Sequence, residues 1–284
     1  MSRQAGTSTH DQAETEDPME TVHKPRSYGE HADHWLDFEE SPRRVRVKFG
    51  GETLADSGRA MLLREAGHVP VYYFPREDVR MEFLTANDHH TRCSVKGEAS
   101  YWDVAAGGKT AESAAWSYLD PLEQSRDIAG YVSFYWNRMD GWYEEEDEIF
   151  VHARDPYKRV DVLQSSRHVQ VTLGGEVVAD SRQPRLVIET GHLIRYYLPR
   201  EDVRTELLEP SDTRTRCPYK GGANYWSVNV NGKVFEDTVW SYEEPIPECP
   251  RIKDLMCFFN ERVDAIHVDG ERLEIPRTKW SRGS

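Results

Sequence analysis

The sequence TRCSVKGEASYW (residues 91–102) returns 124 positions later as TRCPYKGGANYW (residues 215–226). The same shift, without a gap, aligns the residues on either side, so that WSYLDP falls on WSYEEP. Over residues 45–121, 39 of 77 positions are identical to their counterparts. Unrelated sequences of ordinary composition agree at only about one position in fifteen to twenty. The chain therefore contains two copies of one domain of roughly 110 residues.

The repeat divides the chain into three parts. We expect residues 1–40 to form a disordered acidic tail followed by a strap on the first domain, because the first thirty residues are rich in Ser, Thr, Glu and Asp. Residues 41–150 form the first repeat domain, and residues 151–284 form a lead-in strap and the second repeat domain. Two such domains about a pseudo-twofold axis would mimic a dimer within one chain, so we expect a monomer.

The composition restricts the partners. The 284 residues include 50 Asp and Glu against 36 Lys and Arg, which gives a net charge of −14. An acidic surface repels phosphates and anionic headgroups, so we expect neither nucleic acid nor a membrane as partner. No run approaches the roughly 18–20 apolar residues of a membrane span. The N-terminal residues also lack the apolar core of a secretory signal, so we expect a cytoplasmic protein.

The local patterns predict an all-β fold in each copy. Val45, Val47 and Phe49 alternate before a Gly-Gly pair, which indicates a hairpin. The sequence PREDVRMEFL (residues 75–84) predicts the one short helix, because proline stands at its start and acids occupy its first turn. The acidic run at residues 144–148 predicts a solvated edge or turn.

The clearest hairpin spans residues 225–242, where Asn-Gly at 231–232 favours a type I′ turn. If the turn has two residues and the strands have no bulge, Val230 lies opposite Lys233, and Val228 lies opposite Phe235. A bulge would exchange the two faces. One face is then apolar and predicts a core; it carries Trp226, Val228, Val230, Phe235 and Val239. The other face is aromatic yet polar, which suits a binding surface or a covered surface. It carries Tyr225, Ser227, Asn229, Thr238, Trp240 and Tyr242, and the first copy repeats its aromatic members as Tyr101, Trp116 and Tyr118.

Two groups of three residues at corresponding positions are candidates for chemistry. They are Arg92, Cys93 and Lys96 in the first copy, and Arg216, Cys217 and Lys220 in the second. A cysteine near two cations can be a nucleophile, although a lone cysteine is more commonly a small buried apolar residue. The cations can contact an anionic ligand, or they can be surface charges that cap a turn. Both readings remain open for both groups.

The sequence predicts no metal site and no disulfide framework. The remaining cysteines are Cys249 and Cys257, and none of the four forms a C-x-x-C pair. The shared acids Glu65, Asp78, Glu189 and Asp202 invite a reading as catalytic acids or metal ligands, but those in the PRED motif are better explained as acids at a helix N-terminus. No motif identifies a cofactor.

Several motifs together resemble a known bacterial family. VYYFPREDV, TRCSVKGEASYW, WSY and their second copies look like the tandem form of the family called domain of unknown function 427, also labelled nucleotidyltransferase-like. The resemblance covers residues 34–274 and implies a compact β domain of the β-tent type, related in shape to zinc-binding ligand-reading modules such as the thalidomide-binding domain of cereblon. It implies no established activity. This chain lacks the paired C-x-x-C motifs of the zinc-bearing modules, and it lacks a Gly-Ser followed by paired aspartates for metal-assisted nucleotidyl transfer.

These observations favour a small-molecule-binding module. Each aromatic face would wall a pocket, edged by the arginine and lysine of the same copy, for a flat anionic and nucleotide-like ligand. Two alternatives stay open. One is an enzyme, either nucleotidyltransferase-like or dependent on Cys93 or Cys217. The other is a structural or interaction protein in which the aromatic faces are buried between the repeats.

Overall fold

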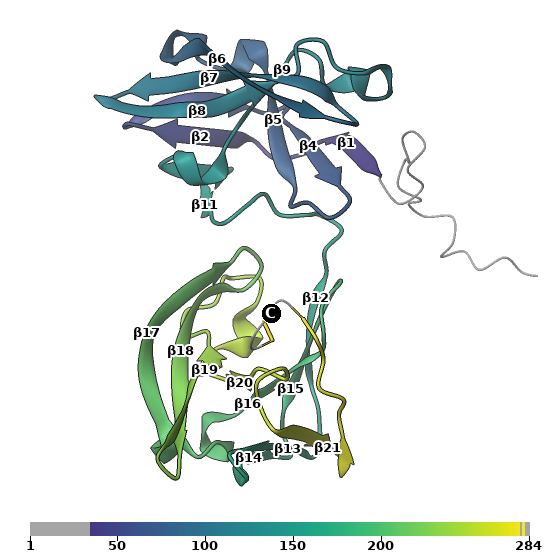
Figure 1. Ribbon diagram of the computed structural model, residues 1–284, viewed down its shortest axis with the longest axis vertical. Helices are drawn as coiled ribbons and strands as arrows, with labels where there is room; N and C mark the ends of the chain where they lie inside the picture. The colour runs from purple at the N-terminus through teal and green to yellow at the C-terminus, as the bar shows by residue number, and fades with distance from the viewer. Residues whose placement is uncertain (1–34, 279, 282–284) are drawn as a thin grey trace, which may run out of the picture.

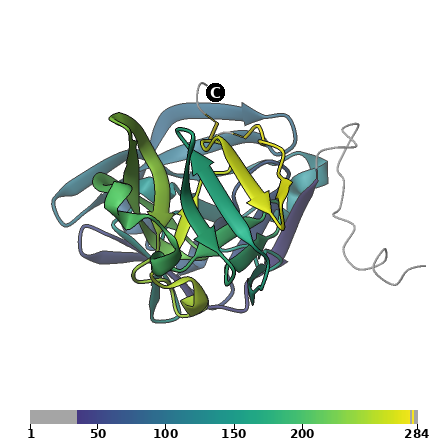
Figure 2. The ribbon, with the colours of Figure 1, turned by 90° about the horizontal axis from the view of Figure 1, so that it is seen from below.

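The structure, a computed structural model, describes residues 35–278, 280 and 281. Two β domains are stacked along the long axis of the molecule and are joined by a linker near residues 150–159 (Figure 1). A view along that axis shows one domain in front of the other (Figure 2). The tail predicted at residues 1–30 lies outside the described residues. No described helix is long and apolar enough to cross a membrane.

The first domain consists of two antiparallel sheets. The seven-stranded sheet comprises, in spatial order, β1 (Leu36–Glu40), β4 (Met61–Glu65), β5 (Val71–Pro75), β9 (Tyr131–Phe134), β8 (Lys109–Ser117), β7 (Gly97–Ala106) and β6 (Leu84–Cys93). The four-stranded sheet comprises β11 (Asp147–Ile149), β10 (Gly141–Glu144), β2 (Val45–Phe49) and β3 (Glu52–Ser57). Short 3₁₀ turns connect strands at η1 (Arg76–Asp78), η2 (Met81–Phe83), η3 (Glu123–Ile128) and η4 (Trp136–Arg138).

The second domain repeats this order. Its seven-stranded sheet comprises β12 (Val160–Gln164), β15 (Arg185–Glu189), β16 (Arg195–Leu198), β20 (Met256–Phe258), β19 (Lys233–Ser241), β18 (Gly221–Val230) and β17 (Leu208–Cys217). Its four-stranded sheet comprises β14 (Glu176–Ser181), β13 (Val169–Leu173), β21 (Ala265–Val268) and β22 (Glu271–Arg272). The 3₁₀ turns are η5 (Arg200–Asp202), η6 (Thr205–Leu207) and η7 (Pro250–Ile252). The prediction of two tandem all-β copies is confirmed.

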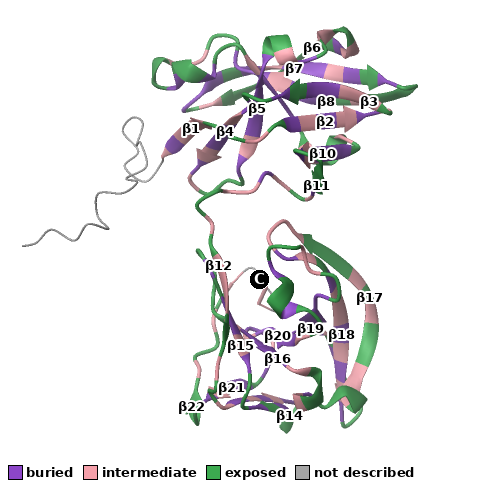
Figure 3. Ribbon diagram, turned by 180° about the vertical axis from the view of Figure 1, so that it is seen from behind, coloured by how far each residue is buried: buried purple, intermediate pink, exposed green. Residues whose placement is uncertain are grey.

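Each large sheet buries side chains on both of its faces. One face packs against the small sheet and forms the main core, to which β2 contributes Val45, Val47 and Phe49, as their alternation predicts. The other face carries a second cluster that contains the predicted aromatic residues of that copy. The outermost strand, β17, is exposed along most of its length (Figure 3). The aromatic face is therefore an inner surface of each domain.

The predicted hairpin register is confirmed at the turn. Val230 pairs with Lys233 and Val228 pairs with Phe235, and Asn231 and Gly232 both adopt positive φ, as a type I′ turn requires. Further along, β19 contains two more residues than β18 between successive pairs. Because this bulge adds an even number of residues, side chains keep alternating and the predicted faces survive.

The predicted short helix of the first copy is two consecutive 3₁₀ turns, η1 and η2. Val79 forms a bridge with Ala55 between them, which interrupts any longer helix. Asp78 accepts hydrogen bonds from Ser57 and Arg59 at 2.7–3.1 Å. The acids therefore bind neighbouring side chains and do not extend a helix. The second copy has the same pair of turns, η5 and η6.

The interpretation of residues 144–148 as solvated is wrong for Glu144. This residue ends β10, pairs with β2 and turns its side chain inward. Its carboxylate accepts a hydrogen bond from Tyr72 Oη at 2.7 Å and contacts Arg43 at 3.3 Å and Arg154 at 2.9 Å. The next residues of the run are exposed. Burial of this charge is possible because three donors surround it.

We expect Glu144→Gln to lower the free energy of unfolding by about 3–5 kcal/mol, because the change leaves Arg43 and Arg154 without their buried counter-charge. The exposed Glu146, whose pair with Arg46 faces solvent, is the control. Glu146→Gln should change stability by less than about 1 kcal/mol. Urea unfolding measures both variants, and equal small losses would contradict the structural role assigned to Glu144.

Candidate functional site

A buried lysine–glutamate pair lies on the aromatic face of each domain. Lys96 donates to Glu65 in the first domain, and Lys220 donates to Glu189 in the second. Each glutamate ends the second strand of its large sheet, and each lysine lies in the turn between the last two strands. Those positions would be about 20 Å apart in a flat sheet, at 4.7–4.9 Å per strand. The pair therefore requires the sheet to curl around a concave inner face.

Aromatic hydrogen bonds repeat beside each pair. Trp116 Nε1 donates to Tyr73 Oη at 3.1 Å, and its counterpart Trp240 donates to Tyr197 at 3.0 Å. The hydroxyls of Thr91 and Tyr101 lie 2.8 Å apart, and those of Thr215 and Tyr225 lie 2.9 Å apart. The same hydrogen bonds therefore position the aromatic side chains in both copies.

The cysteines fall into two environments. Cys93 and Cys217 are half-buried at the ends of β6 and β17, whereas Cys249 and Cys257 are buried. Burial raises the pKa of Cys249 to about 11 and raises that of Cys257 further. The pKa of Lys220 is raised above its usual value. Burial lowers this pKa, but the nearby Cys217 and Glu189 raise it by more.

The second domain has a cleft of about 440 Å³ on this inner face. Strands β15 to β19, the turn between β17 and β18 and the residues that follow β19 and β20 provide most of its aromatic and charged lining. The interdomain linker provides residues 151, 152 and 158, and Val69 reaches the cleft from the first domain. Of the described lining residues, four are cations (Lys158, Arg195, Arg216 and Lys220), and Glu189 is the single carboxylate. This balance is the reverse of that of the whole chain, which carries a net charge of −14.

Arg195 distinguishes this site from the first domain, where Val71 occupies the same position. Its guanidinium forms a two-point ion pair with Glu261, with both N–O distances at 2.7 Å. The same group lies 5.6–5.8 Å from the ring centroids of Trp240, Phe259 and Trp280. Cation–π contacts on several sides fix the arginine in the wall of the cleft.

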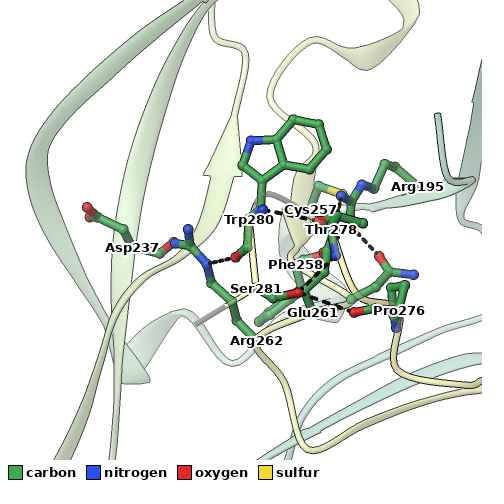
Figure 4. Close-up of polar contacts among 11 residues, drawn as sticks. Arg195, Asp237, Cys257, Phe258, Glu261, Arg262, Pro276, Thr278, Trp280 and Ser281 are labelled. Atoms are coloured by element: carbon green, nitrogen blue, oxygen red, sulfur yellow. Dashed lines mark hydrogen bonds and ion pairs between the residues drawn. The ribbon is translucent and has the colours of Figure 1, made fainter. Parts of the chain in front are cut away.

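The C-terminal segment packs over the same wall (Figure 4). Thr278 Oγ1 donates to Glu261 at 2.8 Å, and Arg262 Nε donates to the carbonyl oxygen of Trp280 at 2.9 Å. The Trp280 ring lies 6.1 Å from that of His192. The segment therefore adds an aromatic side to the cleft from outside the large sheet.

A second cleft of about 750 Å³ adjoins the first. Its lining includes Phe150, the 221–224 segment of β18 and the acidic pair Glu243 and Glu244. Thr215, Arg216 and Cys217 line both clefts. The Arg216 guanidinium lies 4.2 Å from the Phe150 ring centroid, so the boundary between the clefts carries an exposed cation and a thiol.

The structure brings the predicted residues of the second copy together. Tyr225, Trp240, Tyr242, Arg216, Lys220 and Cys217 all line the 440 Å³ cleft. In the first copy, Tyr101 and Tyr118 are buried, Trp116 is half-buried, Arg92 is exposed and Lys96 is buried. The two lysines are neither surface charges nor unpaired cations, because a glutamate neutralises each of them.

Sequence reasoning missed several residues that lie beside the candidate site. Glu65 and Glu189 stand out in the sequence as acids that both copies share, but their pairing with Lys96 and Lys220 was not predicted. Arg195 and Lys158 carried no such signal, because the repeat does not preserve Arg195 and the linker precedes the strongly matching region. Trp280 lies beyond the repeat altogether.

The duplicated sheets, each with a buried ion pair on an aromatic inner face, define a tandem-domain β protein. The chain belongs to the family described as Domain of unknown function (DUF427), whose model, named NTP_transf_9, matches residues 37–145 and 161–269. The two matches are offset by the same 124 residues as the internal repeat. No curated protein matches the chain. Within the described part of the chain, no three His, Cys, Asp or Glu side chains gather as a metal ion would require.

The ion pair predicts a pH dependence. Burial raises the pKa of Glu189, but Lys220 and Lys158 lower it by more, so it lies below the usual 4.5. Such a group contributes stability that is complete above its unfolded-state pKa and is lost as the pH falls through its folded-state pKa. Glu189→Gln should therefore flatten the decline of unfolding free energy between about pH 5 and about pH 3. Urea unfolding across this range measures the decline, and the exposed Glu148→Gln should keep the wild-type slope.

The cysteine environments predict selective labelling. Iodoacetamide should modify Cys93 and Cys217 in the folded protein, because both thiols are partly accessible. Cys249 and Cys257 should react only after denaturation, since burial raises their pKa and blocks access. Peptide mass spectrometry before and after denaturation gives the answer. Equal labelling of all four in the folded state would contradict the buried placement.

Proposed function

We propose that the second domain binds a small, flat, anionic molecule in its 440 Å³ cleft. The observation that carries this proposal is the lining: four cations and one carboxylate, set among aromatic rings, in a strongly acidic protein. Small-molecule sites usually have volumes of about 300–1,000 Å³ and combine apolar walls with a few convergent polar groups. The cleft matches that description in both size and chemistry.

The aromatic side chains supply a stacking surface. Tyr225 is half-buried, and its ring stacks with that of Phe259 at a centroid distance of 6.5 Å. Phe259 in turn lies 4.4 Å from Trp240. Trp240 and Tyr242 are largely buried behind them and hold the surface in place. A flat ring of the ligand would lie against Tyr225, with Trp280 on the C-terminal side.

The cations supply attraction for an anionic group. Arg216 is exposed at the mouth of the cleft, where it can contact a phosphate or carboxylate directly. Lys220 is committed to Glu189, so its contribution is to the local field and to the shape of the floor. A base or similar ring that carries an oxyanion, as in a nucleotide, combines both requirements.

Three probes separate these requirements: AMP, adenosine and ribose 5-phosphate. We expect AMP to quench tryptophan fluorescence and to bind at least tenfold more tightly than either partial probe, since it alone offers both a ring and an anion. Tyr225→Ala should weaken AMP binding about tenfold, which corresponds to about 1.4 kcal/mol. Tyr143→Ala, at a half-buried tyrosine of the first domain, is the control. An absence of any response from the wild-type protein would overturn the proposal for this ligand class.

A thiol-dependent activity is the second candidate, and the position of Cys217 favours it. This thiol lines both clefts and is half-buried beside Lys220. A ligand in either cleft would therefore lie within reach of a nucleophile. If AMP binds and also slows iodoacetamide labelling of Cys217 but not of Cys93, the thiol faces the bound molecule. Unchanged labelling would remove the support for this candidate.

A further inference from the structure

We propose that Lys158, on the linker between the domains, makes the principal contact to the ligand's oxyanion, and that the first domain holds this lysine in position. The inference rests on the proposed function of the cleft and extends it. The binding site then belongs to both domains, although the stacking surface belongs to the second alone.

The first argument is the charge balance around Glu189. Its Oε2 atom accepts from Lys220, and its Oε1 atom lies 2.9 Å from Lys158 Nζ. One carboxylate therefore faces two ammonium groups, and one positive charge in the pair of lysines has no counterpart at Glu189. A ligand carboxylate or phosphate would provide it. Such pairing is strongest where water is partly excluded, as it is here.

The second argument is which lysine the ligand can reach. The Lys220 side chain is 11% exposed, whereas that of Lys158 is 19% exposed. The Lys158 ammonium also lies 3.4 Å from His192 Nδ1 and 5.0 Å from the ring centroid of Tyr219, and both residues line the cleft. Lys158 thus directs its charge along the cleft wall beside further hydrogen-bonding groups.

The third argument is that the linker is docked on the first domain. The Tyr157 ring lies 4.1 Å from the guanidinium of Arg64, and Tyr157 Oη donates to Glu39 at 2.8 Å. Arg154 joins the buried Glu144 of the first domain to Glu248 of the second, at 2.9 and 2.6 Å. These contacts hold the linker residues that precede Lys158 against the first domain.

The second domain holds the same linker from the other side. The backbone N–H of Asp155 donates to Tyr219 Oη at 2.8 Å, and that of Arg159 donates to Thr190 Oγ1 at 3.0 Å. Lys158 lies between these two anchors. An ammonium group on a fixed backbone loses less entropy when an anion binds than one on a mobile segment does. First-domain contacts that never touch the ligand therefore contribute to its affinity.

The test is calorimetric titration of the full-length chain with AMP and with adenosine. We expect Lys158→Met to weaken AMP binding about tenfold while the affinity for adenosine stays within about twofold, because only AMP carries the oxyanion. The fold should persist, since Glu189 keeps Lys220 as its partner. Arg159→Met is the matched control, because the neighbouring side chain is 79% exposed and pairs with Asp161 outside the cleft. It should bind AMP like the wild type.

A second variant tests the role of the first domain. Tyr157→Ala removes the contacts to Arg64 and Glu39 at a residue that does not line the cleft. We expect a severalfold loss of AMP affinity with little change for adenosine.

Wild-type AMP affinity in Lys158→Met would overturn the inference and leave the proposed function standing. Wild-type AMP affinity in Tyr157→Ala would overturn the part assigned to the first domain. A wild-type protein that binds neither probe would overturn the proposed function, and the inference with it.

Discussion

Each domain depends on a buried lysine–glutamate pair that connects distant parts of its large sheet. The glutamate lies on the second strand and the lysine lies in the turn between the last two, so contact between them curls the sheet into a trough. Neither charge can be buried alone, since desolvation of an unpaired ion costs several kcal/mol. The pair therefore couples the curvature of the sheet to charge neutrality. The aromatic residues line the inside of that trough because alternation along the strands turns them toward it.

The duplication preserved this framework and allowed the contents of the trough to diverge. Both copies keep the ion pair, the Trp–Tyr hydrogen bond and the Thr–Tyr hydrogen bond. The second copy adds Arg195 with Glu261, where the first has Val71 and Asn137. It also has the C-terminal segment over one wall and the linker along another. The second copy of the fold thus has a basic cleft in a protein that is acidic as a whole.

The linker is held between the two domains by contacts between opposite charges. Arg154 pairs with Glu144 of the first domain and Glu248 of the second. The ring of Tyr157 lies against the guanidinium of Arg64 in the first domain. Surface ion pairs are individually weak. Glu144 is different, because it is buried and its carboxylate contacts Tyr72, Arg43 and Arg154. The position of the linker is therefore tied to the core of the first domain, which supports the proposal that both domains shape one site.

The sequence by itself determined the duplication, the all-β class, the register of the 225–242 hairpin at its turn and the division of its side chains into two faces. The duplication follows from the self-match at an offset of 124 residues, and the other features follow from short-range periodicity and turn residues, which adjacent residues carry. The same reasoning placed Glu144 in solvent and expected one helix where two 3₁₀ turns form, because a buried partner or a bridge to a distant strand leaves no local trace. Only the tertiary structure decided that Lys96 and Lys220 are neutralised, and that Lys158, Arg195 and Trp280 surround the cleft. Those contacts join residues far apart in the chain, and they form only because the curvature of the sheet brings distant strands and the turns between them close together.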